Sequence, residues 1–232
     1  MNIIVFGGGK VGKFGHDFCL RARAEGHKVI IYSHALNGTN DSDQHVINYN
    51  DLNQVNEVFT NTANNLDTID LVLFNQVGGL YPCEPDLFQE PKLDMYLNAL
   101  NSIVTIPHLF VSKFAHKFHK DTKVVNMTSN LSMEYNKNIH VSGLVGYAGS
   151  KAWSTHLIQA YARHSKRNGI YFTISPSMNY ESEEIKQTYP EWLDSLYKLI
   201  FTADEKINGR IITAYDRSGH KDLKITFSQS EL

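Results

Sequence analysis

The sequence predicts an α/β fold, with one domain built on a doubly wound parallel sheet and helices on both faces. Two observations support this prediction. Short apolar runs alternate with longer segments whose apolar residues recur at helical spacing, along most of the 232 residues. The first apolar run, Asn2 to Phe6, leads directly into the glycine-rich segment Gly7 to Gly15. Unbroken alternation favours parallel strands, because a helix then carries the chain from each strand to the next.

The predicted strands are short and mostly apolar, as expected of strands covered on both faces. In order they run from Asn2 to Phe6, Lys28 to Tyr32, His45 to Ile47, Ile69 to Phe74, Lys123 to Met127, Ile170 to Ser175 and Ile211 to Ala214, with an edge strand from Leu223 to Phe227. The predicted helices run from Lys13 to Glu25, Leu52 to Asn65, Leu93 to His119 and Tyr147 to Asn168. Pro107 is expected to kink or break the third helix.

One segment, Ser177 to Asn208, interrupts the alternation between two core strands. It is polar and carries four aromatic residues, which are Tyr180, Tyr189, Trp192 and Tyr197. Ligands of doubly wound sheets bind beyond the carboxyl ends of the strands, where this segment begins. We therefore expect it to form a lid over a substrate.

Charge, hydropathy and cysteine content argue against several classes of protein. A formal net charge of -2 argues against a protein that depends on phosphate contacts with nucleic acid. No apolar run is long enough for a membrane helix, and the amino terminus predicts a strand rather than a signal peptide. Only two cysteines occur, Cys19 and Cys83, which fits free thiols in a reducing cytoplasm. The histidines His16, His116 and His119 match no metal motif, so no metal is expected.

The glycine-rich segment predicts a dinucleotide site. Gly7, Gly9 and Gly12 satisfy G-x-G-x-x-G after a strand and before a helix. Missing side chains permit the tight turn and let backbone N–H groups approach a pyrophosphate at the helix amino terminus. The second strand ends in Ser33 and His34 without the carboxylate that usually holds the ribose of NAD. NADP is therefore favoured as the cofactor, and NAD stays open.

Two residues farther along could move a proton. Tyr147 and Lys151, in Y-A-G-S-K, lie four apart on one predicted helix and so point the same way. A free tyrosine has a pKa of about 10, and a nearby ammonium lowers it. Tyr147 could then act as general acid or base towards a carbonyl or alcohol.

Taken in order along the chain, these motifs resemble the short-chain dehydrogenase/reductase family. The resemblance runs from Asn2 to about Ala214. Besides the glycine turn and Y-x-x-x-K, it rests on Asn75 to Gly78, which resembles N-N-A-G, and on Val124 to Ser129, which resembles the strand that ends in the catalytic serine. The resemblance implies a single NAD(P)-binding, Rossmann-type domain over residues 1–232. The activity that it implies is hydride transfer between a nicotinamide and a small carbonyl or alcohol.

The family also implies roles for single residues. Tyr147, Lys151, Ser129 and a helix asparagine would be catalytic: Lys151 would also bond the nicotinamide ribose, Ser129 would bond the substrate oxygen, and the asparagine would hold a water next to Lys151. Asn101 is favoured for the asparagine, and Asn98 is the alternative. The cofactor would contact Gly7, Gly9, Gly12, Phe14, Ser33, His34, Asn75, Val77, Tyr147, Lys151 and Pro176.

The sequence departs from the family at several positions. Phe14 replaces the third glycine in one register of the turn, and Asn48 replaces the aspartate that usually contacts adenine. Ser175-Pro176-Ser177 stands where the family has P-G, and Tyr135 to Ser142 is expected to be a small insertion. Tyr135 and His140 could contact a substrate from there or be plain surface residues.

Three functions are consistent with these residues. The first is a reductase of a small carbonyl compound, and a pterin-like, acyl-thioester or sugar substrate stays open. The second is a non-catalytic sensor or interaction protein that binds NAD(P). The third is a nucleotide-sugar epimerase, for which the chain is short. The family implies a homodimer or homotetramer formed by the helices at Leu93 to His119 and Tyr147 to Asn168. The apolar face at Trp153, Leu157 and Tyr161 is compatible with such an interface and equally with packing on the sheet.

Overall fold

The sheet has the predicted doubly wound order. The computed structural model describes residues 1–35, 43–76, 93–129, 145–164, 168–176, 183–215 and 224–228. Its eight strands lie in the order β3-β2-β1-β4-β5-β6-β7-β8. All neighbours pair in parallel except β7 and β8, which pair antiparallel at one edge. The strand order reverses between β1 and β4, and that switch point is where doubly wound sheets bind ligands.

The strand bounds agree closely with the prediction, except for one. The strands are β1 (Asn2–Phe6), β2 (Lys28–Ser33), β3 (Gln44–Val46), β4 (Ile69–Phe74), β5 (Phe118–Met127), β6 (Ile170–Pro176), β7 (Ile211–Tyr215) and β8 (Lys224–Ser228). The exception is β5, which begins five residues before the predicted Lys123. Its pairing with β4 shifts register between Ile69 and Leu71, so the early part of β5 is an irregular extension.

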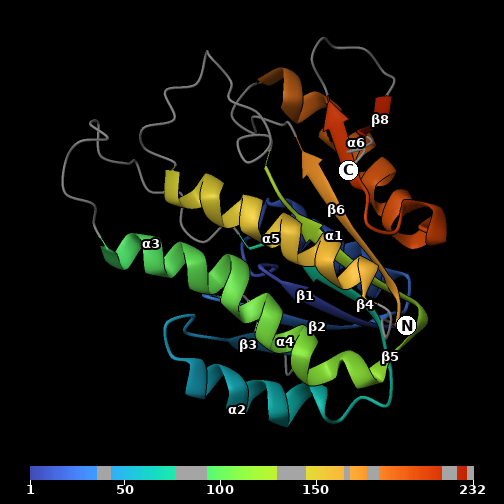
Figure 1. Ribbon diagram of the computed structural model, residues 1–232. Coiled ribbons are helices and arrows are strands. Elements are labelled where there is room, and N and C mark those ends of the chain that lie inside the picture. The colour runs from blue at the N-terminus through green and yellow to red at the C-terminus, as the bar shows by residue number, and fades with distance from the viewer. Residues whose placement is uncertain are drawn as a thin grey trace.

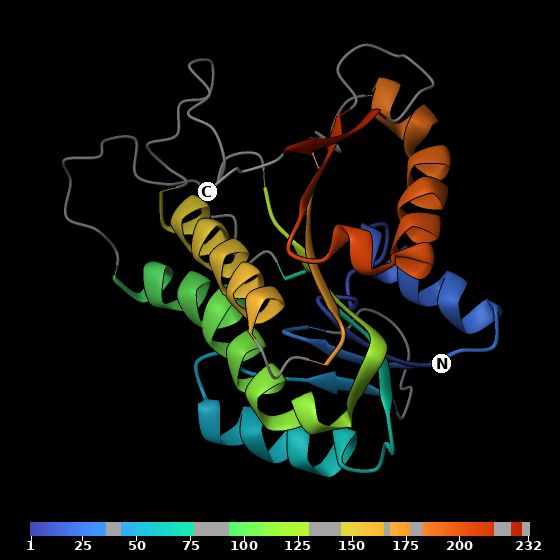
Figure 2. The same cartoon turned by 45° about the vertical axis from the view of Figure 1, so that its right-hand side comes forward.

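Helices cover both faces of the sheet, as predicted. They are α1 (Phe14–Ala24), α2 (Leu52–Ala63), α3 (Leu93–Leu100), α4 (Ile106–Phe114), α5 (Val145–Arg163) and α6 (Glu183–Thr202). One core cluster joins the sheet to α1 and α6, and a second joins it to α2, α4 and α5. Figures 1 and 2 show these two helix layers on opposite sides of the strands. None of the described helices is long and apolar enough to cross a membrane.

The long third helix is interrupted earlier than predicted. Between α3 and α4 lies one wide π-helical turn, η1 (Asn101–Thr105), in which the Ile106 N–H donates to the Asn101 carbonyl. Pro107 stands in the first turn of α4, directly after this π-helical turn, and its missing N–H cannot donate to a carbonyl of the preceding turn. The helical structure then ends in a short 3-10 turn, η2 (Ala115–Lys117), before β5. The prediction of helix as far as His119 was therefore wrong.

The segment expected to form a lid contains α6, whose apolar side packs on α1. Trp192 and Tyr197 are buried in the core, and the Trp192 ring lies 5.5 Å from that of Phe14. The Tyr189 hydroxyl donates to Asp17 at 2.8 Å, and the Tyr197 hydroxyl to Glu25 at 2.8 Å. These three aromatic residues hold α6 to α1. Tyr180 and the other residues of 177–182 lie outside the described part of the chain, and the lid stays a prediction.

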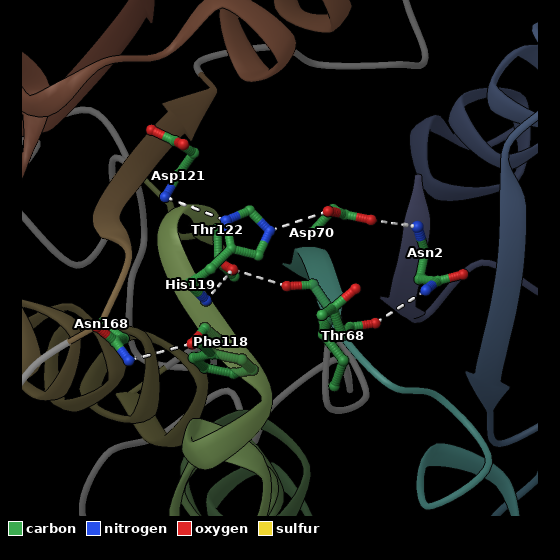
Figure 3. Close-up of polar contacts among 9 residues, drawn as sticks. Asn2, Thr68, Asp70, Phe118, His119, Asp121, Thr122 and Asn168 are labelled. Atoms are coloured by element: carbon green, nitrogen blue, oxygen red, sulfur yellow. Dashed lines mark hydrogen bonds and ion pairs between the residues drawn. The ribbon is translucent and has the colours of Figure 1, made fainter.

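A polar cluster joins the amino ends of the three central strands, at the opposite edge from the switch point (Figure 3). The Asp70 carboxylate accepts from the Asn2 backbone N–H at 2.6 Å and contacts His119 Nε2 at 2.9 Å. The Thr122 hydroxyl donates to the Ile69 carbonyl at 2.7 Å. This cluster ties β1, β4 and β5 together where the register of β5 is irregular.

Candidate active site

The glycine turn begins at the carboxyl end of β1 and is held by both neighbouring strands. The Gly7 N–H donates to the Tyr32 carbonyl of β2 at 2.8 Å, and Gly7 has a φ of +83°. On the other side, the Asn75 amide after β4 donates to the Gly7 carbonyl at 3.3 Å. A Cβ added to Gly7 would lie 2.9 Å from the Asn75 carbonyl oxygen. Glycine is therefore required here by backbone conformation and by packing.

The next predicted glycines serve different purposes. A Cβ on Gly9 would lie 2.3 Å from the Ala35 carbonyl oxygen and 2.6 Å from Ser33 Oγ, so Gly9 lets the turn lie against the end of β2. Gly12 has a φ of +70°, and a Cβ there would meet no described atom within 4 Å. The turn is thus closely packed at Gly9 and open at Gly12, and α1 begins two residues later.

Phe14 does not face this open side. Its side chain is 2% exposed, and its ring lies 5.9 Å from the Phe18 ring within the core. Lys13, the N-cap of α1, makes no side-chain capping bond, so no side chain of the N-cap covers the backbone N–H groups at the start of the helix. Phe14 can therefore offer a cofactor its backbone N–H but not its ring.

The end of β2 lies beside the turn. Ser33 is buried against Gly9, while His34 is exposed and its ring lies 6.1 Å from that of Tyr49 in a stacked arrangement. Asn48 is exposed, and its amide oxygen accepts from the Asn50 N–H at 3.1 Å. A hydroxyl, an imidazole and an amide thus lie where the ends of β2 and β3 approach the glycine turn.

Three predicted catalytic residues come together at the carboxyl end of β5. Helix α5 carries Tyr147 and Lys151, and Ser129 follows β5. The Ser129 and Tyr147 side chains share a hydrogen bond. The Lys151 ammonium lies 5.8 Å from the centre of the Tyr147 ring. The structure therefore brings the predicted serine, tyrosine and lysine to one place.

Lys151 is held in an unexpected way. It is 3% exposed, and its ammonium donates to the Gln76 carbonyl at 2.7 Å and to the Met127 carbonyl at 2.5 Å. These neutral oxygens belong to the carboxyl ends of β4 and β5. Burial without a carboxylate partner disfavours the charged form and lowers the pKa of Lys151 to about 7.

The expected effect on Tyr147 is not found in this arrangement. Burial raises the pKa of the Tyr147 hydroxyl, and the hydrogen bond with Ser129 lowers it by a smaller amount. The prediction that the Lys151 ammonium lowers the pKa of Tyr147 was incomplete, because the desolvation of this largely buried phenol has the larger effect.

Neither helix asparagine contacts Lys151. The Asn101 amide donates to the Asn50 side chain at 3.2 Å, and the Asn50 amide donates to the Asn98 side chain at 3.3 Å. Asn50 therefore bridges both candidates from the loop after β3. The choice between Asn98 and Asn101 is not resolved by this geometry, since both face the same partner.

A layer of buried polar residues fixes α5 on the sheet below Lys151. The Thr155 hydroxyl donates to Thr128 Oγ1 at 3.0 Å, and the Asn126 amide donates to the Ser154 hydroxyl at 3.2 Å. The Lys151 carbonyl accepts from the Ser154 hydroxyl at 2.9 Å, and it also lies 2.9 Å from the Thr155 hydroxyl, whose single proton it shares with Thr128 Oγ1. These directional bonds set the height of Tyr147 and Lys151 along the strands.

Solved structures with the same fold are known, although no sequence match was found. No protein-family model and no curated protein sequence matches the chain. Among solved structures, a Brucella ovis oxidoreductase of the short-chain dehydrogenase/reductase family, in complex with a partially ordered NAD, matches with a TM-score of 0.68 at 17% identity, over 91% of this chain and 98% of that chain. The fold is that of short-chain dehydrogenases/reductases.

Two dehydrogenase structures with a bound nicotinamide cofactor are also similar to this chain. 4-Hydroxyisoleucine dehydrogenase complexed with NADH has a TM-score of 0.69 at 16% identity, over 91% of this chain and 96% of that one. A Beutenbergia cavernae protein described as an NAD(P)-dependent gluconate 5-dehydrogenase, with NADP bound at low occupancy, has a TM-score of 0.67 at 16% identity, over 91% and 94%. Identities this low establish the fold and no more.

Some residues predicted from the family pattern, or from the expected insertion, lie outside the described part of the chain. They are Val77, Tyr135, His140 and Ser177. Pro176 ends β6 beside Ala214 of β7, and the preceding Ser175 is fully buried with an unpartnered hydroxyl. Within the described residues, no group of three or more His, Cys, Asp or Glu side chains could hold a metal ion.

Sequence reasoning missed two residues of the site. Gln76 follows Asn75 and was read only as part of the N-N-A-G-like segment, although a glutamine there is polar and next to a buried strand end. Asn50 gave no signal at all, because its partners lie about 50 positions away in the sequence.

Proposed function

We propose that this chain is an NAD(P)-dependent oxidoreductase of the short-chain dehydrogenase/reductase type. It would transfer a hydride between a nicotinamide and a small carbonyl or alcohol. The observation that carries the proposal is the hydrogen bond between Ser129 and Tyr147, with the Lys151 ammonium 5.8 Å from the tyrosine ring. This group lies at the carboxyl ends of β4 and β5, one strand from the glycine turn, on a sheet whose fold neighbours include structures with NAD, NADH and NADP.

The described residues fit a dinucleotide. The turn is open at Gly12, the first N–H groups of α1 carry no side-chain cap, and the Gln76 amide is a buried donor without a partner. Gly7, Gly9, Gly12 and the backbone of Phe14 would hold the pyrophosphate. Ser33 and His34 favour NADP, since neither repels a 2′-phosphate, and Asn75 would support the turn.

The cofactor would supply or accept the hydride. Tyr147 would donate its phenolic proton to the substrate oxygen during reduction, and a raised pKa keeps that proton on the hydroxyl at neutral pH. Ser129 would donate to the same oxygen and stabilise its developing negative charge. Lys151, with a pKa of about 7, could take either protonation state near neutrality and replace the proton lost by Tyr147.

A second function is supported by one observation. Lys151 is bonded to two backbone carbonyls, and neither helix asparagine contacts it. A non-catalytic NAD(P)-binding sensor or interaction protein would have the same fold and could use Lys151 only to join β4, β5 and α5.

Replacing Tyr147 by phenylalanine separates the two functions. We expect Tyr147→Phe to lower the turnover of a carbonyl panel with NADPH by about 10²–10⁴-fold, the usual contribution of a general acid. The affinity for NADPH, measured from the fluorescence of the cofactor, should change little. Tyr161→Phe is the matched control on the same helix, because Tyr161 bonds His108 on α4.

The outcome decides between the functions directly. Turnover that survives in Tyr147→Phe, or a wild-type chain that binds NADPH without reducing any carbonyl, would favour the binding protein. Loss of turnover in Tyr147→Phe, with unchanged turnover in Tyr161→Phe, supports the enzyme.

Association and location are also proposed. Trp153 on α5 is 57% exposed, and Leu93 and Leu97 on α3 are exposed as well, which supports a homodimer or homotetramer through this face. Leu157 and Tyr161 pack inwards and contribute less of that surface. Cys19 is a buried free thiol, which is compatible with the proposed cytoplasmic location.

A further inference from the structure

The Gln76 side chain is buried at the candidate site and lacks a hydrogen-bond partner for its N–H group. Gln76 is 3% exposed, and its Nε2 atom has no acceptor. Buried amides nearly always find partners in folded proteins, and an orphaned one costs about 1–3 kcal/mol. Such a group calls for a physical explanation, and a binding site is one of the few that account for it.

The position of Gln76 relates it to Lys151. The Gln76 carbonyl accepts from the Lys151 ammonium at 2.7 Å, so the head of the lysine lies beside the backbone of Gln76. Along β4, Val72 and Phe74 face the helix layer that contains α5, and Gln76 follows two residues after the end of this strand. The side chain of Asn75 faces the opposite layer and the glycine turn.

The two candidate helix asparagines bond to Asn50 rather than to Lys151. Asn101 uses its amide on Asn50 and its carbonyl on the Ile106 N–H of the π-helical turn. Asn98 accepts from Asn50 with its side chain and from the Ser102 hydroxyl with its carbonyl. Gln76 is thus a polar side chain next to Lys151 that still has a free donor.

We propose that the Gln76 amide is a ligand-binding group of this site, whose N–H donates to an oxygen beside the Lys151 ammonium when a nicotinamide dinucleotide is bound. The inference rests on the proposed function. The oxygen is a neutral acceptor, either a hydroxyl of the second ribose of the dinucleotide or an ordered water that links Lys151 to solvent. Lys151 and Gln76 would then approach that oxygen with two donors.

The test replaces Gln76 by methionine, which keeps the length of the side chain and removes the donor. In the free protein, Gln76→Met should raise Tm by about 2–6 °C, because an apolar side chain removes an unsatisfied buried group. Thr173→Val is the matched control: the Thr173 hydroxyl is also buried and unpartnered, but it lies within β6 rather than at its end. That variant should raise Tm similarly and leave ligand binding unchanged.

Ligand titrations distinguish the two sources of the oxygen. If the oxygen is a ribose hydroxyl, Gln76→Met should lower the affinities for NADPH and ADP-ribose by about threefold to tenfold, which is the effect of one hydrogen bond. The affinity for ADP should stay the same. If it is a water, all three affinities stay the same, and the pH profile of turnover shifts in Gln76→Met but not in Thr173→Val. Either result supports the proposal.

Three results count against it. A free Gln76→Met protein that is less stable than wild type would show that the amide has a structural partner. Unchanged affinities together with an unchanged pH profile would overturn the inference while leaving the proposed function intact. A wild-type chain that binds neither NADH nor NADPH would remove the proposed function, and this inference with it.

Discussion

Replacing Lys151 by methionine should stabilise the protein near neutral pH while removing the proposed activity. The pKa of Lys151 falls from an ordinary 10.5 to about 7 because the ammonium is buried. That difference corresponds to at most ~5 kcal/mol of unfavourable free energy when the group is charged. Methionine also leaves the Gln76 and Met127 carbonyls without this donor, which offsets part of the gain. We expect a net gain of about 2 kcal/mol at pH 6, or a Tm higher by about 4–8 °C.

The pH dependence gives this prediction its signature. Between about pH 7 and 10.5 the unfolded chain holds a proton on Lys151 that the folded chain has released. Stability that depends on this residue therefore rises with pH through that window and is lowest below pH 7. Lys151→Met has no such group, so its advantage over wild type should shrink as the pH is raised from 6 to 9.

Urea unfolding of both proteins at several pH values measures this difference. Lys198→Met is the matched control, because the Lys198 side chain is 68% exposed, and its removal should change the free energy of unfolding by less than about 1 kcal/mol at any pH. The reasoning fails if Lys151→Met is less stable than wild type at pH 6. It also fails if the two stability curves run parallel between pH 6 and 9.

Two further substitutions test the glycine turn and the strand cluster. Gly9→Ala should destabilise the turn by about 2 kcal/mol or more and weaken NADPH binding, because its Cβ would lie 2.3 Å from the Ala35 carbonyl oxygen. Gly149→Ala, with open space around it, should be neutral or slightly stabilising, and equal behaviour of the two would contradict this. Asp70→Asn should lower the free energy of unfolding by about 1 kcal/mol at pH 7, since the carboxylate pairs with His119 and Asn2. Burial raises the pKa of Asp70, but the bonds from Asn2 and His119 outweigh it, so that the pKa lies below its ordinary value. The loss should therefore shrink progressively as the pH falls below about 4. A deficit that does not shrink on acidification would refute that assignment.

The core strands could be predicted because their sequences are simple. Asn2–Phe6 and Ile69–Phe74 are short apolar runs, and helices cover both of their faces. The start of β5 could not be predicted, because Phe114 and Phe118 continue a helical apolar spacing past the true end of the helix. The π-helical turn at Asn101–Thr105 inserts one residue into a helical pattern, which periodicity alone does not detect.

The helix within the expected lid segment could have been predicted from its spacing. Tyr189, Trp192, Leu196 and Ile200 recur every three or four residues, which is the spacing of a buried helix face. In the structure these residues pack against α1, and the lid itself stays a prediction.

The proximity of three candidate residues could be predicted from the sequence, but their contacts could not. The order of motifs identified Ser129, Tyr147 and Lys151, and the structure brings them together. Spacing along a helix predicts which residues point the same way, but not which atoms they contact. The two carbonyls that hold Lys151 and the bridge from Asn50 to the helix asparagines join distant segments, and no local pattern marks such contacts.

The polar layer between α5 and the sheet has a consequence for how this sequence can drift over evolution. Thr128, Thr155 and Ser154 share acceptors and donors, so each depends on the others for its hydrogen bonds. A change at one position leaves a buried partner unsatisfied, and a second change is needed to repair it. These positions should therefore be strongly epistatic and vary in pairs or not at all. The outward side of the same helix, where Trp153 is exposed, is free of that constraint.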